Sequence, residues 1–241
     1  MMADMALILV TGASAGLGRA AADALAGDGH DVVVHARNAG RFAGAGDTGR
    51  WAGLVTGDLA RPEEIHDVAR QAAAFGRFDA VIHNAGVLRS PEVATVNTVA
   101  PYLLTALMDK PGRLIYLSSS MHRTGSTDLR RLSSGRASYD DTKLWVTTLA
   151  LACASRWEGT SSHAVDPGWV PTRMGGRGAP DDLVAGHRTQ VWLATHEDVT
   201  PRTGGYWYHQ QPRPPHPAAR DEEFQAELIR VLEAHTGVAL G

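Results

Sequence analysis

The stretch TGASAGLGRA at residues 11–20 brings together three glycines, Gly12, Gly16 and Gly18. It follows the apolar run ALILV at 6–10 and precedes a segment whose apolar residues recur at the spacing of one helical face. The pattern predicts a buried strand, a tight turn and a helix that packs on a sheet. In such a turn glycines let the backbone approach a phosphate group, and the helix N-terminus offers unpaired N–H groups. The alternative is a tight turn that binds nothing. The helical stripe consists of Leu17, Ala20, Ala21, Ala24 and Leu25.

Short apolar runs alternate with helical segments along the chain, which is typical of βαβ units. We expect an α/β fold with one Rossmann-type doubly wound parallel sheet of about seven strands, in the order 3-2-1-4-5-6-7, and helices on both faces. Residues 38–50 show no period and are predicted to be a loop with at most a weak helix. The proline-rich residues 210–217 are predicted to be a surface connection. The predicted strands are residues 6–10, 32–34, 51–55, 79–82, 113–117, 163–165 and 205–208.

The composition is that of a soluble protein with one domain. The chain has 241 residues, of which 44% are hydrophobic and 20% charged. Its formal charge of -3 argues against nucleic acid as a partner, because such domains carry a strong basic excess. Cys153 is the only cysteine, so neither a disulfide framework nor a metal site is expected. The first apolar run is too short for a signal peptide and no membrane span is suggested, so a cytoplasmic location is expected.

The stretch YDDTK at 139–143 is either an exposed charged turn or the acid end of a catalytic site. Tyr139 and Lys143 are four residues apart and therefore share one helical face. Ser138 and Asp141 resemble a capping box, which explains the aspartate by the start of a helix. A tyrosine here could give a proton to a carbonyl that accepts hydride. This requires a nearby ammonium and the helix N-terminus to lower the tyrosine pKa from its usual value of about 10.

Two other elements offer partners to this pair. The strand 113–117 ends at LSSS, and open α/β sheets bind ligands at the carboxyl ends of their strands. Asn97 lies in a helical segment with Pro101 four residues later, and a proline has no N–H to donate to the carbonyl of Asn97. We therefore expect a kink there and a carbonyl that is free to hold a water. The alternative is that Asn97 is an ordinary polar helix residue.

Together these stretches resemble the short-chain dehydrogenase/reductase family, over most of the chain. The glycine turn reads TGxxxGxG instead of GxGxxG, and it is followed in the family's order by GDL, HNAG, YxxxK and DPGWVPT. These motifs begin at Gly57, His83, Tyr139 and Asp166, with His83 in place of a more common asparagine.

The resemblance implies a role for each motif. Tyr139 would donate the proton, and Lys143 would lower its pKa and bind ribose hydroxyls. Ser119 would hold the substrate oxygen, with Ser118 as a close alternative and Ser120 less favoured. The backbone of Asn97 would hold a water linked to the lysine. The residues implied in binding a dinucleotide are Gly12, Ser14, Gly16, Leu17, Gly18, Arg37, Asp58, Leu59, Asn84, Ala85, Gly86, Tyr139, Lys143, Pro167, Gly168, Val170 and Thr172.

The interval of 20 residues from Ser119 to Tyr139 is similar to that in the branch of retinol dehydrogenases and protochlorophyllide reductases. The cofactor type is predicted from VVVHARN at 32–38. NAD sites carry an acid at the end of the second strand, whereas an arginine accommodates the 2′-phosphate of NADP. With Ala36 at the acid position and Arg37 beside it, NADP(H) is favoured. NAD(H) is the alternative if Arg37 is only a solvated cation.

The sequence thus predicts an NADP(H)-dependent oxidoreductase that acts on a small carbonyl or alcohol, with a cofactor half up to about residue 110 and a catalytic half beyond it. The alternatives are an NAD(H)-dependent alcohol dehydrogenase, an epimerase or dehydratase, and a cofactor-binding sensor without chemistry. Arginines in loops 121–137 and 172–190 would suit an anionic substrate or are solvated surface. Trp169 is either pocket wall or simple packing. A homodimer or homotetramer through the helices beside the central strands is typical of the family.

Overall fold

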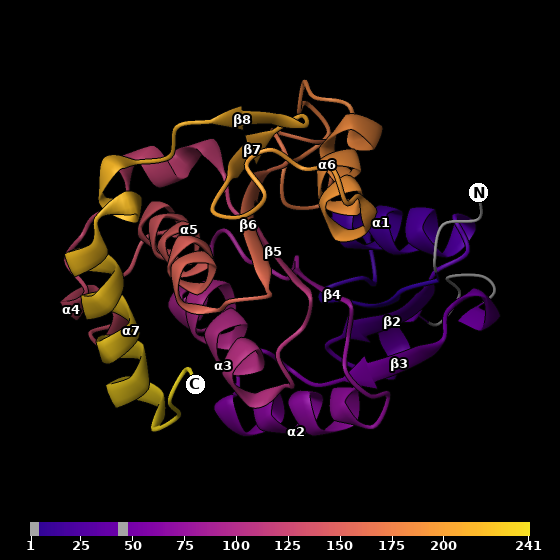
Figure 1. Ribbon diagram of the computed structural model, residues 1–241, viewed down its shortest axis with the longest axis horizontal. Helices are drawn as coiled ribbons and strands as arrows, with labels where there is room; N and C mark the ends of the chain where they lie inside the picture. Colours follow the sequence, from indigo (N-terminus) through magenta and orange to yellow (C-terminus); the bar gives the residue numbers. More distant parts are fainter. Residues whose placement is uncertain (1–4, 43–47) are drawn as a thin grey trace.

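The computed structural model describes residues 5–42 and 48–241. The strands in these ranges form one sheet in the order β3-β2-β1-β4-β5-β6-β7-β8, parallel as far as β7 (Figure 1). The predicted α/β fold and the order of the first seven strands are confirmed. The strands are β1 Leu7–Val10, β2 Asp31–Ala36, β3 Gly53–Thr56, β4 Ala80–His83, β5 Arg113–Leu117, β6 Ser161–Asp166, β7 Tyr206–Tyr208 and β8 Gln211–Arg213.

Helices cover both faces of the sheet. Helices α1 and α6 pack side by side on one face, and α2, α3 and α5 lie on the other (Figure 1). Alternate side chains of a strand point to opposite faces of the sheet and belong to different hydrophobic cores. In β1, Ile8 and Val10 pack on the α1 side, whereas Leu9 packs on the α5 side. No helix in the described ranges is long and apolar enough to cross a membrane. The helices are α1 Gly16–Gly27, α2 Pro62–Ala73, α3 Ala100–Leu107, α4 Arg130–Ser133, α5 Tyr139–Arg156, α6 Leu183–Thr195 and α7 Glu222–Thr236.

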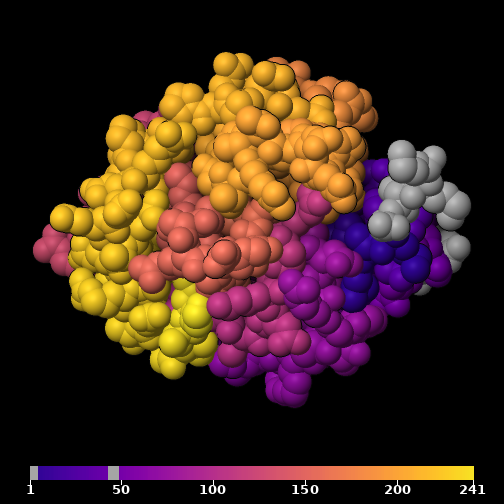
Figure 2. All heavy atoms as spheres, in the orientation of Figure 1, coloured from indigo at the N-terminus to yellow at the C-terminus, as the bar shows by residue number. Residues whose placement is uncertain are grey.

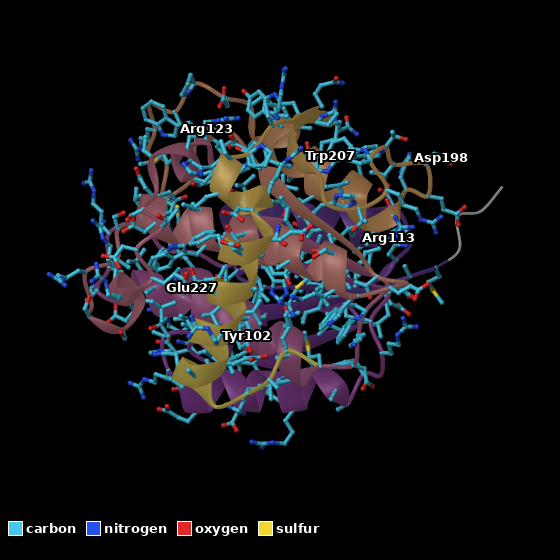
Figure 3. All side chains as sticks on the ribbon, turned by 60° about the vertical axis from the view of Figure 1, so that its left-hand side comes forward. Tyr102, Arg113, Arg123, Asp198, Trp207 and Glu227 are labelled. Carbon is cyan, nitrogen blue, oxygen red and sulfur yellow. The ribbon has the colours of Figure 1, made fainter. Side chains whose placement is uncertain are left out.

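Helix α5 is buried along its length, with an unbroken run of buried residues from Asp141 to Cys153. Its inner side meets β5 and β6, and its outer side is covered by α7 and by the short 3-10 helix at Pro217–Arg220. The C-terminal segment is also tied to α3, because the hydroxyl of Tyr102 donates to the carbonyl of Val238 at 2.6 Å. Figure 2 shows this segment packed against α3 and α5, and Figure 3 shows α7 running past Tyr102. A helix that is covered all round needs no single apolar stripe.

The sheet has one strand that the sequence did not reveal. The prediction that residues 210–217 are only a surface connection is wrong for Gln211–Arg213, which pair antiparallel with β7. His209 and Gln210 form the turn between these strands with φ of 48° and 61°, as in a type I′ hairpin. Pro212 is tolerated because β8 is an edge strand. The turn lacks the glycine or asparagine that usually marks this geometry, so local sequence gave no signal.

Of the predicted loop 38–50, residues 39–42 and 48–50 form 3-10 turns. Residues 43–47 of that prediction lie outside the described ranges.

Candidate active site

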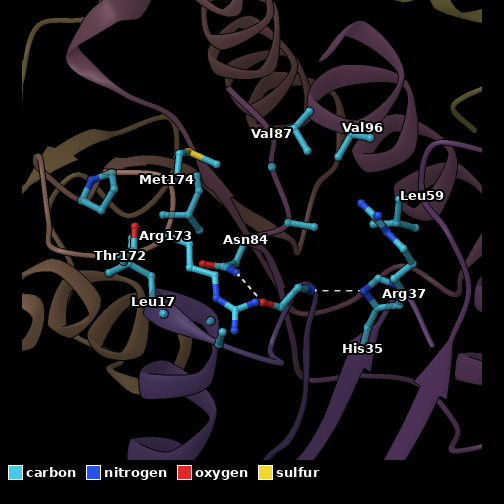
Figure 4. Close-up of a pocket in the computed structure, with 18 of the residues that line it drawn as sticks. Leu17, His35, Arg37, Leu59, Asn84, Val87, Val96, Thr172, Arg173 and Met174 are labelled. Atoms are coloured by element: carbon cyan, nitrogen blue, oxygen red, sulfur yellow. Dashed lines mark hydrogen bonds between the residues drawn. The ribbon is translucent and has the colours of Figure 1, made fainter. Parts of the chain in front are cut away.

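A cavity of about 250 Å³ lies at the carboxyl ends of the central strands (Figure 4). Most of the residues that the sequence assigned to a dinucleotide line it. Ser14, Gly168 and Val170 do not, and neither do Asn97 and Ser119. The lining residues that the sequence did not assign are Ala15, His35, Gly57, Val87, Val96, Leu117, Ser118, Arg173 and Met174.

The glycine turn fits closely against the end of β4. Gly12 has a φ of 66°, and a Cβ placed on it would lie 2.8 Å from the Cα of Ala85, so no other residue fits there without a shift. The side chain of Asn84 donates to the carbonyl of Thr11 at 2.8 Å and so holds the turn in place. Helix α1 begins after Ala15 without a side-chain cap and without an acidic residue in its first turn. Its first N–H groups are therefore available to an anion in the cavity.

His35 is a site residue that sequence reasoning missed. Its Nδ1 accepts from the N–H of Gly12 at 3.1 Å, so its Nε2 must donate to the carbonyl of Gly57 at 2.9 Å. Burial lowers the pKa of this imidazole, which keeps it neutral. His35 thus joins the glycine turn to the end of β3. The sequence could have indicated His35 as a site residue by its position near the carboxyl end of a predicted strand, the end at which ligands bind.

Arg37 follows the end of β2 and lines the same cavity. Its Nε is 3.4 Å from the Oδ2 of Asp58, and the side chain is half exposed. The pair brings Arg37, which was predicted to bind the 2′-phosphate, next to Asp58, another residue implied in binding a dinucleotide. Residue 36 is an alanine, so β2 ends without a carboxylate.

The YDDTK stretch is the start of α5, and the predicted capping box is present. Ser138 Oγ accepts from the N–H of Asp141 at 3.1 Å, and Asp141 Oδ2 accepts from the N–H of Ser138 at 2.9 Å. Lys143 is only 5% exposed, and its Nζ donates to the carbonyl of Leu117 at 2.7 Å. The same Nζ is 5.4 Å from the ring centre of Tyr139. The stretch is therefore not an exposed charged turn.

Burial shifts the pKa values of the two residues in opposite senses. It raises the pKa of Tyr139 to about 12, although a hydrogen bond with Ser119 lowers it. Burial lowers the pKa of Lys143 to about 8, and the carboxylate of Asp166 opposes this. That Lys143 lowers the pKa of Tyr139 stays a prediction. In the protein alone, Tyr139 is a protonated phenol at neutral pH.

The three serines after β5 take different positions. The hydroxyl of Thr147 donates its one proton to the carbonyl of Lys143 at 2.7 Å. In the 2.6 Å hydrogen bond between Ser118 and Thr147, Ser118 must therefore be the donor. The Ser118 hydroxyl is therefore engaged in the core. Ser119 is the one of the three whose side chain lowers the pKa of Tyr139, and Ser120 is exposed. This geometry favours Ser119 over Ser118 as the partner of a substrate oxygen.

Asn97 is buried and fixes two neighbouring segments. Its side chain accepts from the N–H of Val87 at 2.8 Å and donates to the carbonyl of Val87 at 2.9 Å. It also donates to the hydroxyl of Thr142 at 3.1 Å, which links the loop after β4 to α5. A π-helical turn at Thr95–Val99 precedes α3, at the place where Pro101 was expected to disturb the helix. The free carbonyl of Asn97 stays a prediction.

A second acid lies next to this set and was not assigned from the sequence. Asp166, 6% exposed at the end of β6, accepts from the N–H of Gly168 at 3.0 Å and from the hydroxyl of Tyr206 at 3.0 Å. Burial raises the pKa of this carboxyl. The ring of Tyr206 packs against His122 with ring centres 4.5 Å apart. These contacts join residues that are far apart in sequence, so local pattern could not reveal them.

Three arginines of the 121–137 loop, which would suit an anionic substrate or be solvated surface, already have partners in the protein. Arg123 donates to the carbonyl of Pro214 at 2.7 Å, Arg130 pairs with Asp128, and Arg131 pairs with Asp141. This favours solvated surface over an anion-binding rim for that loop.

Trp169 is 59% exposed, and its indole donates to the carbonyl of Gly175 at 2.8 Å. It does not line the cavity. No group of His, Cys, Asp or Glu suited to a metal ion occurs within the described ranges.

Known proteins are similar to this chain in sequence and in fold. The short chain dehydrogenase family matches residues 6–182. An uncharacterized oxidoreductase of Emericella nidulans is 39% identical, and the match covers 98% of this chain and 99% of the relative. Mouse retinol dehydrogenase 14 is 27% identical over 96% of this chain and 86% of its own length. A solved Shigella flexneri short chain dehydrogenase complexed with NADP has a TM-score of 0.69 and 25% identity, over 87% of this chain and 98% of that one. The chain therefore belongs to the short chain dehydrogenase family of oxidoreductases and resembles its retinol dehydrogenase branch.

Proposed function

We propose that the protein is an NADP(H)-dependent oxidoreductase that transfers hydride between the nicotinamide and a carbonyl or alcohol group of a small molecule. One observation carries this proposal. Tyr139 and Lys143 line the same cavity as the glycine turn and Arg37. The dinucleotide fits this cavity, because the uncapped N-terminus of α1 suits its phosphates. When bound, it supplies the hydride.

The side chains of the protein supply the proton that the substrate oxygen takes up. In the reducing direction Ser119 orients the carbonyl oxygen, and Tyr139 gives its phenolic proton to that oxygen as the hydride reaches the carbon. The raised pKa of Tyr139 keeps the phenol protonated at neutral pH, so that this proton is available in the reducing direction. Lys143, with its pKa lowered to about 8, is suited to pass a proton toward the tyrosine after each turnover. The buried amide of Asn97 keeps α5 in register with the loop after β4.

Arg37 is the basis for preferring NADP(H). A guanidinium binds a phosphate with charge-assisted hydrogen bonds, and β2 ends without the carboxylate that would bind a ribose 2′-hydroxyl. The pairing with Asp58 holds Arg37 at the cavity. The solved relative in complex with NADP is consistent with this choice.

The test is a screen of aldehydes, ketones and alcohols with NADPH, NADH and their oxidised forms. We expect turnover with lower KM for NADPH. Tyr139→Phe should bind the dinucleotide almost normally but lose about a hundredfold to ten-thousandfold in turnover. Near-normal rates in that variant, or a clear preference for NADH, would contradict the proposal. Product formation without net change in cofactor absorbance would indicate an epimerase or dehydratase, and binding without turnover would indicate a sensor.

A further inference from the structure

Arg173 enters the cavity from the segment that follows Thr172. Figure 4 shows its side chain extending toward Asn84, whereas Arg37 lies on the opposite side of the cavity. Asn84 is itself bonded to the glycine turn. The two arginines therefore face different parts of any ligand that fills the cavity.

The side chain of Arg173 is exposed to solvent. In the parts of the chain that the structure describes, its guanidinium has neither a hydrogen bond nor an ion pair. Asp58 is the one acid among the cavity's lining residues, and it is paired with Arg37. Lys143 adds a further cation to the same lining. The part of the cavity near the glycine turn is thus ready for an anion.

The backbone that carries Arg173 is fixed rather than loose. Thr172 Oγ1 accepts from the N–H of Gly175 at 3.2 Å, and the carbonyl of Gly175 accepts from the indole of Trp169 at 2.8 Å. A Cβ placed on Gly16 would lie 3.2 Å from the Cγ2 of Thr172, so this segment touches the glycine turn at the start of α1. Arg173 therefore leaves the backbone beside the exposed N–H groups of that helix.

We propose that Arg173 binds the phosphate groups that join the two halves of the dinucleotide, opposite the N-terminus of α1, and so holds the 172–174 segment over the cofactor. A planar guanidinium binds such groups in two places at once, as a single ammonium does not. The assignment rests on the proposed dinucleotide site but not on the choice of NADP(H), because both cofactors carry the same phosphate bridge.

The experiment measures dissociation constants of NADPH and NADH by fluorescence titration, independently of turnover. Arg173→Gln should weaken both dinucleotides by the same factor, about tenfold to a hundredfold, the usual range for hydrogen bonds to charged groups. Arg37→Gln should weaken NADPH alone. Arg177→Gln, an exposed arginine nearby that does not line the cavity, is the matched control and should change neither constant.

Smaller ligands sharpen the assignment. Arg173→Gln should weaken ADP-ribose, which contains the phosphate bridge, but hardly affect adenosine 2′-monophosphate, which lacks it. Arg173→Gln constants equal to wild type, or a loss confined to NADPH, would overturn the role of Arg173. If Arg37→Gln has no effect while Arg173→Gln weakens both dinucleotides, the assignment stands and the NADP(H) preference fails. A wild-type protein that binds neither dinucleotide would overturn the proposed function and this assignment with it.

Discussion

His122 holds the backbone of Ser119 in place: its Nδ1 lies 2.7 Å from the carbonyl oxygen of Ser119. The other ring nitrogen, Nε2, accepts from the N–H of His216 at 2.9 Å, so Nδ1 must be the protonated one. Burial lowers the pKa of His122 to about 4, which keeps this tautomer neutral. The residue that orients Ser119 is thus itself anchored by the segment before α7.

His122→Phe should reduce activity more than cofactor binding. The ring contact with Tyr206 is retained, but the carbonyl of Ser119 and the N–H of His216 lose their partner. We expect kcat/KM to fall at least about tenfold with an unchanged dissociation constant for NADPH, and stability to fall by about 2 kcal/mol or more. His122→Asn, which can still donate to Ser119, should recover part of the activity. Unchanged kcat/KM in His122→Phe would show that the contact does not position the serine.

Acid should destabilise the protein through buried histidines. Burial lowers the pKa of His122 and His163 to about 4 and that of His83 to about 3. The unfolded chain takes up protons as pH falls through about 6.5, but the folded protein does not, so stability is full above that pH and is lost toward the folded values. The expected loss is about 2 kcal/mol per histidine between about pH 7 and pH 5.

Thermal unfolding across this pH range measures the effect. His83→Asn removes one of these buried histidines and should make the pH dependence shallower. An equal slope in the two proteins would contradict a neutral, buried His83.

Lys143→Met should abolish turnover yet raise stability. The pKa of Lys143 is lowered to about 8 from its usual 10.5, so its charged form is disfavoured in the folded protein. Removing that charge should gain about 1 to 3 kcal/mol at neutral pH, after allowing for the lost bond to the carbonyl of Leu117. The penalty is present below about pH 8 and fades as pH rises. Wild-type stability should therefore rise between about pH 8 and pH 10 relative to the variant. Denaturant unfolding of both proteins checks this, and a less stable Lys143→Met would contradict it.

The protein should be a monomer. The dimers typical of the family use the helices beside the central strands, but here the outer side of α5 is covered by α7 and by Pro217–Arg220. Light scattering after size-exclusion chromatography at micromolar concentration should give the mass of one chain. A stable dimer or tetramer would mean that another surface is used.

The features that the sequence predicted are those that show as a pattern of residue types along the chain. The glycine turn and the capping box of Ser138 and Asp141 follow from residues that are close together in the chain, and the strand order follows from the alternation of strands and helices along it. The positions of His35 and His122 depend on partners 22 and 94 residues away, which no periodicity indicates. Arg173 was visible only as one cation of a supposed rim, and its place in the cavity requires the contact between Thr172 and the glycine turn.

The covering of α5 by the C-terminal residues 217–236 has a consequence during translation of the chain. The ribosome delivers β1 to α6 before α7, so the helix that carries Tyr139 and Lys143 emerges long before the segment that hides its outer side. Until residues 217–236 have left the exit tunnel, that apolar side is open to chaperones and proteases. A chain that stops short of α7 therefore cannot cover the outer side of the helix that carries its predicted proton donor.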